Sequence, residues 1–249
     1  MHLQTRGLVL KVSYFNDHDA LISLLTPEHG RITVKARGLR RKKSTLSAPC
    51  QLLALADYSL FEYKGKYTIN DANVVELFSE LRDDISKLSL GTYFAQVTEL
   101  ISQEDRPNQE VLSLLLNCLY AISKLGIPEA KVKIAFELRC ACLAGYMPDL
   151  SGCASCGAET PDRFDVSGGV LECKGCRNSD SDGLRMPVTP GILDAMRYII
   201  SCAPKAILRF DLGEDSIAKL SQITETYLIT QLERGFTSLD FYKSLQYPL

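Results

Sequence analysis

The chain reads ALISLLTPEHGRITVKAR from residue 20 to residue 37, which is the pattern of two strands joined by a turn. Residues 20–26 form a short apolar run, and residues 31–37 alternate polar and apolar side chains with the period of a half-buried strand. The intervening Pro27-Glu28-His29-Gly30 has the composition of a turn. We therefore predict a β-hairpin over residues 20–37.

More strands are predicted on either side of this hairpin. Residues 7–14 form an earlier strand pattern, and residues 54–63 and 67–69 flank Lys64-Gly65-Lys66, whose glycine suits a tight turn. Five short strands within about 75 residues fit a small closed barrel better than an open sheet. We therefore predict a five-stranded OB-fold β-barrel as the N-terminal domain, over residues 1–80.

Helical periodicity replaces the strand pattern after the barrel. Apolar residues recur at intervals of three and four, and Pro128 and Gly145 stand where a helix begins and ends. The predicted fold class is therefore α+β and multidomain, with an all-α helical domain over residues 81–249 after the barrel. The helical segments are residues 74–90, 90–102, 110–125, 131–143, 190–202 and 215–235.

Four cysteines form two close pairs, and sixteen residues separate the pairs. Cys153-x-x-Cys156 and Cys173-x-x-Cys176 have the spacing typical of a zinc site in which four thiolates surround one ion. Four protein ligands leave no position for water or substrate, so we predict one structural zinc ion per chain. This zinc knuckle would interrupt the helical domain at about residues 150–178. Rubredoxin-like iron and a disulfide are the alternatives.

The predicted third strand opens the most basic part of the chain. No acidic residue occurs between Glu28 and Asp57, whereas seven cations do. Those on the strand fall on one face of the sheet, and the others lie in a basic, flexible loop after Gly38. A strand face and loop of this kind suit a phosphate backbone, and a solvated charge run is the alternative. The predicted DNA-binding residues are Arg31, Lys35, Arg37, Arg40, Arg41, Lys42 and Lys43.

Six aromatic residues of the predicted barrel are candidates for stacking against bases, with burial in the core as the alternative for each. Tyr58 lies an odd number of positions from Phe61 and Tyr63, so these two sets should face opposite sides of their strand and one should be core. The six are Tyr14, Phe15, Tyr58, Phe61, Tyr63 and Tyr67.

The composition is that of an ordinary globular protein. Of the 249 residues, 46% are hydrophobic and 23% are charged, and the net charge is −2. No apolar run approaches the roughly 20 residues of a membrane span, and the N-terminus lacks a signal core, so we expect a cytoplasmic protein without a membrane partner. The other five cysteines are then expected to be small buried thiols. They are Cys50, Cys118, Cys140, Cys142 and Cys202.

Recognisable catalytic motifs are lacking in the sequence. The three histidines form no metal motif with the cysteines, and neither a Walker loop nor a dinucleotide fingerprint occurs. Asp17 and Asp19 resemble a carboxylate pair but more simply mark a turn. A metal-dependent nuclease requires an open metal site, which four thiolates do not leave. We therefore expect a protein that is not an enzyme.

Five motifs spread over nearly the whole chain carry a family resemblance. They are Gly7-Leu8-Val9-Leu10, Val34-Lys35-Ala36-Arg37-Gly38, Phe136-Glu137-Leu138-Arg139, the run Pro148-Asp149-Leu150 leading into the first cysteine pair, and Thr189-Pro190-Gly191. Together they resemble the bacterial RecO family of recombination mediators. The resemblance is weaker after about Cys202, where only spacing and helix pattern carry it.

The resemblance implies both a fold and a function. It implies an N-terminal OB-fold, a helical domain and, in many members, a zinc knuckle. It also implies a protein of the bacterial nucleoid that binds single- and double-stranded DNA and anneals complementary strands without ATP hydrolysis. Together with RecR, such a protein helps RecA to replace single-stranded-DNA-binding protein. The seven basic residues above would carry the DNA-binding face.

The resemblance further implies that the helical domain contacts the acidic C-terminal tail of single-stranded-DNA-binding protein. Arg139 and Lys133 are candidates for this contact, and a structural charge within a helix pair is the alternative for Arg139. A rival function from another class is that of a protein–protein adaptor, whose basic loop docks an acidic peptide and never touches DNA.

Overall fold

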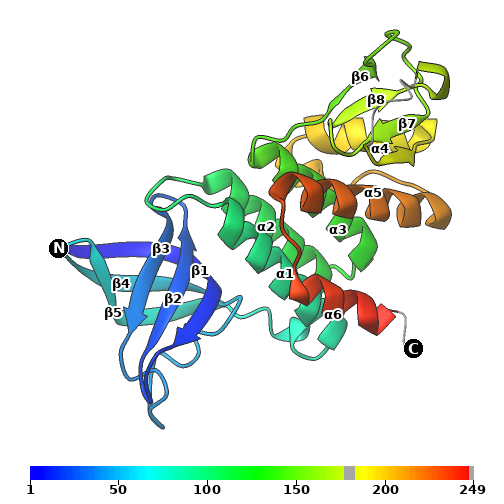
Figure 1. The fold of residues 1–249 in the computed structure, drawn as a ribbon. Helices are drawn as coiled ribbons and strands as arrows, with labels where there is room; N and C mark the ends of the chain where they lie inside the picture. Colours follow the sequence, from blue (N-terminus) through cyan, green and yellow to red (C-terminus); the bar gives the residue numbers. More distant parts are fainter. Residues whose placement is uncertain (177–182, 247–249) are drawn as a thin grey trace. The chain divides into compact units, whose positions relative to one another are not determined.

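A computed structural model describes residues 1–176 and 183–246 of the chain (Figure 1). The chain divides into two compact units. The first unit contains Met1–Gly126 together with Phe236–Leu249, and the second contains Ile127–Gly235.

The first unit contains a closed barrel of five strands, as the sequence predicted. Its strand order is β1-β2-β3-β5-β4, and only the β3–β5 pair is parallel. This is the OB-fold barrel, drawn from blue to cyan in Figure 1. The strands are β1 (His2–Tyr14), β2 (Ala20–Thr26), β3 (Gly30–Ala36), β4 (Leu55–Tyr63) and β5 (Lys66–Glu76).

The interior of the barrel is filled by the alternate apolar residues of the strands. Tyr58 is fully buried there and donates a hydrogen bond from its hydroxyl to the carbonyl oxygen of Pro49 at 2.5 Å. Phe61 and Tyr63, on the same strand, are 40% and 62% exposed. The predicted division of these aromatic residues between the two faces of the strand is therefore confirmed.

The residues of the turn between β4 and β5 suit its backbone geometry. Lys64 and Gly65 have positive φ angles of 49° and 73°, the geometry of a two-residue turn whose twist matches the flanking strands. This turn brings Tyr63 opposite Lys66 in the ladder.

The predicted helix from residue 74 to residue 90 is wrong in its first half. Strand β5 continues through Glu76 because Val74 pairs with Ala56 of β4, and a β-branched side chain suits a strand better than a helix. Helix α1 (Ile85–Ile101) begins later, after Asp84, whose side chain accepts hydrogen bonds from the backbone N–H groups of residues 86 and 87. Apolar spacing alone did not separate the strand end from the helix.

Three α-helices follow the barrel in the described part of the first unit. Helix α1 packs against α2 (Gln109–Ser123) and against α6 (Thr237–Gln246). Phe236, just before α6, lies edge-on to Tyr93 of α1 with ring centroids 5.4 Å apart. Helix α6 was not predicted, because among its ten residues only Leu239 and Tyr242 are buried and the apolar stripe is short. The barrel and these helices belong to one compact unit. The domain boundary at residue 80 stays a prediction.

The described part of the second unit contains three α-helices and a small sheet. Helices α3 (Glu129–Leu143), α4 (Pro190–Ser201) and α5 (Glu214–Leu232) agree with the predicted segments to within a few residues. The cysteine segment was predicted only as a knuckle, but it belongs to a four-stranded sheet of order β6-β8-β7-β9. Its strands are β6 (Asp149–Cys153), β7 (Arg163–Asp165), β8 (Val170–Glu172) and β9 (Arg185–Pro187). Within the described residues, none of the helices has the length and apolar character needed to cross a bilayer.

A buried ion network joins α3 to α5. The Lys133 ammonium lies 2.9 Å from a carboxylate oxygen of Glu137 and 2.8 Å from one of Glu225. The Thr224 hydroxyl donates to Glu137 at 2.7 Å. Burial raises the pKa of Glu137, whereas the Lys133 charge and the Thr224 hydrogen bond act in the opposite direction. The network therefore stabilises the helix pair only if Lys133 and Glu137 are both present, since either charge alone would be buried without its partner.

Replacing Lys133 with methionine should destabilise the second unit by about 3–5 kcal/mol, because the Glu137 carboxylate would remain buried without its main counter-charge. Urea denaturation of the full chain followed by circular dichroism measures this loss. The double variant Lys133→Met/Glu137→Leu should recover most of it, since both buried charges are then absent. Lys219→Met, at an exposed position of α5, serves as the control and should change stability by less than about 0.5 kcal/mol. A double variant no more stable than Lys133→Met would contradict this role.

Candidate functional site

Strand β3 and the segment after it form a basic surface on the barrel. The inner side of β3 carries Ile32, Val34 and Ala36, all buried in the core. The alternate positions therefore turn Arg31 and Lys35 outward, as the sequence predicted. The basic surface consists of Arg31, Lys35, Arg37, Arg40, Arg41, Lys42 and Lys43.

The segment that follows β3 is a series of turns, whereas the sequence suggested a flexible loop. It is fixed at its start because the Gly38 N–H donates to the Asp19 carboxylate at 2.8 Å, and Gly38 has a positive φ of 65°. The Arg40 N–H donates to the carbonyl of His18 at 3.2 Å, and the Leu39 side chain is buried in the barrel core. These contacts hold the backbone while the flanking cationic side chains remain exposed.

The seven basic residues differ in the partners they already have. Arg31 forms an ion pair with Glu104 at 3.0 Å and donates to the carbonyl of Ser102, so it ties β3 to the chain after α1. Lys35 lies 3.3 Å from Asp19. Within residues 1–176 and 183–246, the other five cations form no ion pair, and all five are exposed. These five are Arg37, Arg40, Arg41, Lys42 and Lys43.

Two aromatic residues at the β1–β2 turn extend the basic surface. Tyr14 is 59% exposed and Phe15 is 49% exposed. The Arg40 guanidinium lies 5.3 Å from the centre of the Tyr14 ring, and the Lys35 ammonium lies 4.9 Å from that of Phe15. Each ring thus has a cation over it, which places both rings among the positive charges.

The four predicted zinc ligands come together in the second unit. Cys153 ends β6, Cys173 follows β8, and the sulfur atoms of all four cysteines lie within 4.8 Å of one another. The Cys156 and Cys173 sulfurs are 3.9 Å apart. Zinc–sulfur bonds of about 2.3 Å in a tetrahedron place sulfurs about 3.8 Å apart, whereas a disulfide requires about 2.05 Å. The cluster therefore fits a tetrahedral metal ion, and the alternative of a disulfide is not formed.

The electrostatics of the cluster also favour a bound cation. The backbone N–H groups of Cys156 and Ser155 lower the pKa of the Cys153 thiol to about 6. Burial and the neighbouring Cys153 and Cys156 raise the pKa of the Cys173 thiol to about 12. One thiolate thus forms readily, and its charge opposes ionisation of the next. A metal cation removes this opposition because it attracts all four thiolates.

The candidates for a contact with an acidic tail lie in the helices of the second unit. Lys133 is only 2% exposed and belongs to the ion network of α3 and α5, so it is not accessible to a peptide. Arg139 is half-buried and donates from its guanidinium to the carbonyl of Cys202 at 2.7 Å. This hydrogen bond supports a structural role for the Arg139 charge.

Comparisons with known proteins match both the N-terminal and the C-terminal part of the chain to one family. The family model for the recombination protein O N-terminal domain matches residues 1–78, and the model for the C-terminal domain matches residues 82–240. A protein of Acetivibrio thermocellus named DNA repair protein RecO is 31% identical to this chain, with 98% of this chain and 97% of the relative covered. Proteins of the same name from Alkaliphilus metalliredigens and Caldicellulosiruptor bescii are each 28% identical, with 98% of this chain covered and 100% and 99% of the relatives.

The Asp19 carboxylate should titrate below its ordinary pKa of 3.8, because it accepts the Gly38 N–H and lies beside Lys35. Its contribution to stability is then fully present at neutral pH and is lost as the pH falls below 3.8 through the lower folded-state value. Carbon-detected NMR titration of the side chain measures this pKa. Lys35→Met should raise it only part of the way, since the Gly38 hydrogen bond remains. A value at or above 3.8 in the native chain would show that the turn segment is not fixed in this way.

Proposed function

The chain belongs to the RecO family of DNA repair proteins, and we propose that it is a DNA-binding recombination mediator whose basic surface holds the phosphate backbone. The observation that supports this most directly is the set of five exposed cations at the turn segment, which have no ion-pair partner among the residues that the structure describes. Guanidinium groups make forked contacts to phosphate, and lysines act as point charges. These contacts position DNA without reading its sequence.

Strand annealing follows from the same surface. Two complementary strands repel each other through their phosphates, and this repulsion falls when cations lie beside both backbones. The bases of the two strands are then free to pair. No covalent bond is made or broken in this process, so the proposed activity is non-enzymatic and requires no nucleotide hydrolysis.

The proposed partners are those that the family implies. With RecR, the protein helps to load RecA onto single-stranded DNA covered by single-stranded-DNA-binding protein. The helices of the second unit are proposed to contact the acidic tail of single-stranded-DNA-binding protein. Arg139 stays a candidate for this contact, whereas the burial of Lys133 removes it.

The four-cysteine cluster is proposed to hold one structural zinc ion per chain, with Cys153, Cys156, Cys173 and Cys176 as ligands. Zinc suits a site of four thiolates because it imposes no geometry of its own beyond the tetrahedron the protein supplies. Four sulfur ligands leave no open position, so the ion would stabilise the small sheet and take no part in chemistry.

Reversing the charge of Arg40, Arg41, Lys42 and Lys43 to glutamate should weaken binding to every DNA sequence by at least tenfold. The slope of log K against log salt for duplex DNA should become less negative by up to about 3.6, at about 0.9 for each lost phosphate contact. Fluorescence anisotropy of a labelled oligonucleotide over a salt series measures both quantities. The matched control reverses four exposed cations of the second unit, Lys205, Arg209, Lys219 and Arg234.

Two outcomes would overturn the assignment. Unchanged DNA binding in the basic-surface variant would place the DNA site elsewhere. Binding of an acidic peptide to the unaltered chain, with no retention of DNA at low salt, would instead support the adaptor function.

Freshly purified protein should contain one equivalent of zinc by elemental analysis, and iron should be absent. Cys153→Ser should reduce the zinc content to well below half an equivalent and destabilise the small sheet, because one of four ligands is lost. Cys142→Ser, outside the cluster, is the control and should keep its zinc. DNA binding should persist in both variants. A folded native chain free of metal would refute the zinc assignment, and a coloured protein with one iron would replace it.

A further inference from the structure

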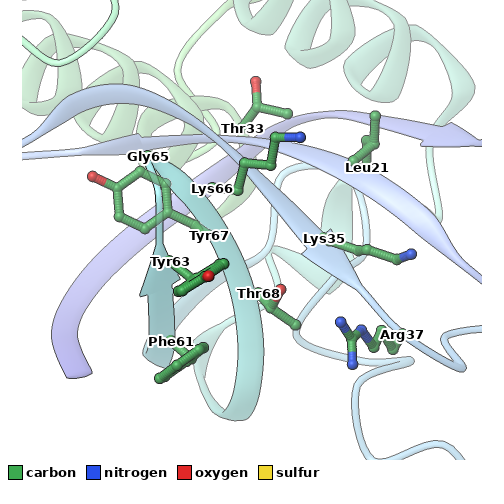
Figure 2. A pocket seen from close by; sticks show the side chains of 10 residues that line it. All are labelled: Leu21, Thr33, Lys35, Arg37, Phe61, Tyr63, Gly65, Lys66, Tyr67 and Thr68. Carbon is green, nitrogen blue, oxygen red and sulfur yellow. The ribbon is translucent and has the colours of Figure 1, made fainter. Parts of the chain in front are cut away.

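A second feature of the barrel surface overlaps the basic surface at Lys35 and Arg37. It is a groove of about 580 Å³, a volume typical of ligand sites, formed by β2, β3 and the β4–β5 hairpin (Figure 2). None of the ten residues that line it is acidic. We call it the aromatic groove, after Phe61, Tyr63 and Tyr67, which share it with Lys35, Arg37 and Lys66.

The strand register brings Phe61 and Lys35 into one row around the barrel. Phe61 of β4 lies opposite Thr68 of β5, and Thr68 lies opposite Lys35 of β3. Lys35 in turn lies opposite Leu21 of β2. Neighbouring strands are about 4.8 Å apart, so Phe61 and Lys35 are separated by about 10 Å across the groove. Figure 2 shows the rings of Phe61 and Tyr63 on one side of Thr68, with Lys35 and Arg37 on the other.

Two rings of the hairpin are exposed on the same face of the barrel. Phe61 and Tyr63 lie two positions apart on β4 and therefore on the same face, at 40% and 62% exposure. His2 lies beside Phe61 with ring centroids 5.4 Å apart, and the Lys64 ammonium lies 5.4 Å from the centre of the Tyr63 ring. Aromatic rings held side by side next to cations have the chemistry that single-stranded nucleic acids require, since bases stack on the rings and phosphates meet the charges.

We propose that the aromatic groove binds unpaired bases, with Phe61 and Tyr63 as stacking surfaces and with Lys35 and Arg37 beside the phosphates. This inference rests on the proposed function and adds a division of labour to it. Arg40, Arg41, Lys42 and Lys43 hold the backbone of any DNA. The groove takes only strands whose bases are unpaired, because the bases of a duplex stack on each other and offer no free face.

The chain contains no tryptophan, which makes a site-specific fluorescence test possible. In Tyr63→Trp, the single indole should be quenched saturably by a thymidine 15-mer and should change little with a duplex of the same length and concentration. Tyr120→Trp on α2, where the native side chain is 50% exposed, is the control and should respond to neither DNA. No quenching of the residue-63 indole by the single strand, or equal quenching by the duplex, would overturn the proposal.

Affinity measurements separate this inference from the proposed function. Phe61→Ala and Tyr63→Ala should each lower the affinity for the single strand by about tenfold or more, and the affinity for duplex should stay within about twofold. Reversal of the four turn cations should lower both affinities. If that reversal acts as expected and the alanine variants bind single strands normally, only the groove assignment fails. If neither kind of variant alters DNA binding, the proposed function fails as well. Circular dichroism confirms folding, and Phe61→Leu or Tyr63→Leu replaces the alanine variant at the same position if that variant does not fold.

Discussion

Closure of the barrel depends on a short parallel contact between β3 and β5, in which Val34 lies opposite Tyr67 and Lys35 opposite Thr68. All other strand pairs in the barrel are antiparallel and extend over more residues. Without this contact, β3 and β5 would be open sheet edges. Because of it, the strand that opens the basic surface lies next to the aromatic β4–β5 hairpin. The basic surface and the aromatic groove are two parts of the surface around this one contact.

The second unit is held together by different means. Its sheet contains strands of only three to five residues, which bury too little apolar surface to be stable alone. The sheet lies in a unit with an apolar core of its own, and the unit also contains two polar clusters: the ion network of α3 and α5, and the four cysteines at the sheet. The first cluster brings the carboxylates of Glu137 and Glu225 together, and the second brings four thiol groups together. Each cluster needs a positive counter-charge when these groups are ionised. Lys133 supplies it in the first cluster, and a zinc ion would supply it in the second.

Local patterns in the sequence were enough to predict much of this structure. Alternation over residues 31–37 placed Arg31 and Lys35 on the outside of the barrel, and the two Cys-x-x-Cys pairs were expected to meet. The odd spacing of Tyr58 from Phe61 and Tyr63 predicted that these residues face opposite sides of β4. Each of these predictions needs only the period of a strand or the reach of a short turn, so no knowledge of distant contacts was required.

The features that escaped prediction depend on residues far apart in the chain. Arg31 looked like a free cation, but Glu104 pairs with it from beyond α1. Lys133 looked like a surface charge, but the facing residues of α5 bury it. Helix α6 gains its stability from packing on α1, which its own composition does not reveal. The aromatic groove likewise exists only because barrel closure sets β3 beside β5.

The most direct measurement is to map single-stranded DNA onto the full chain by backbone amide chemical shifts. If the surface around the β3–β5 contact holds the strand, the largest changes should fall on residues 35–44 and 61–68, at the basic surface and the aromatic groove together. Changes confined to residues 127–235, with the barrel amides unmoved, would contradict the central claim that the closed barrel is where DNA binds.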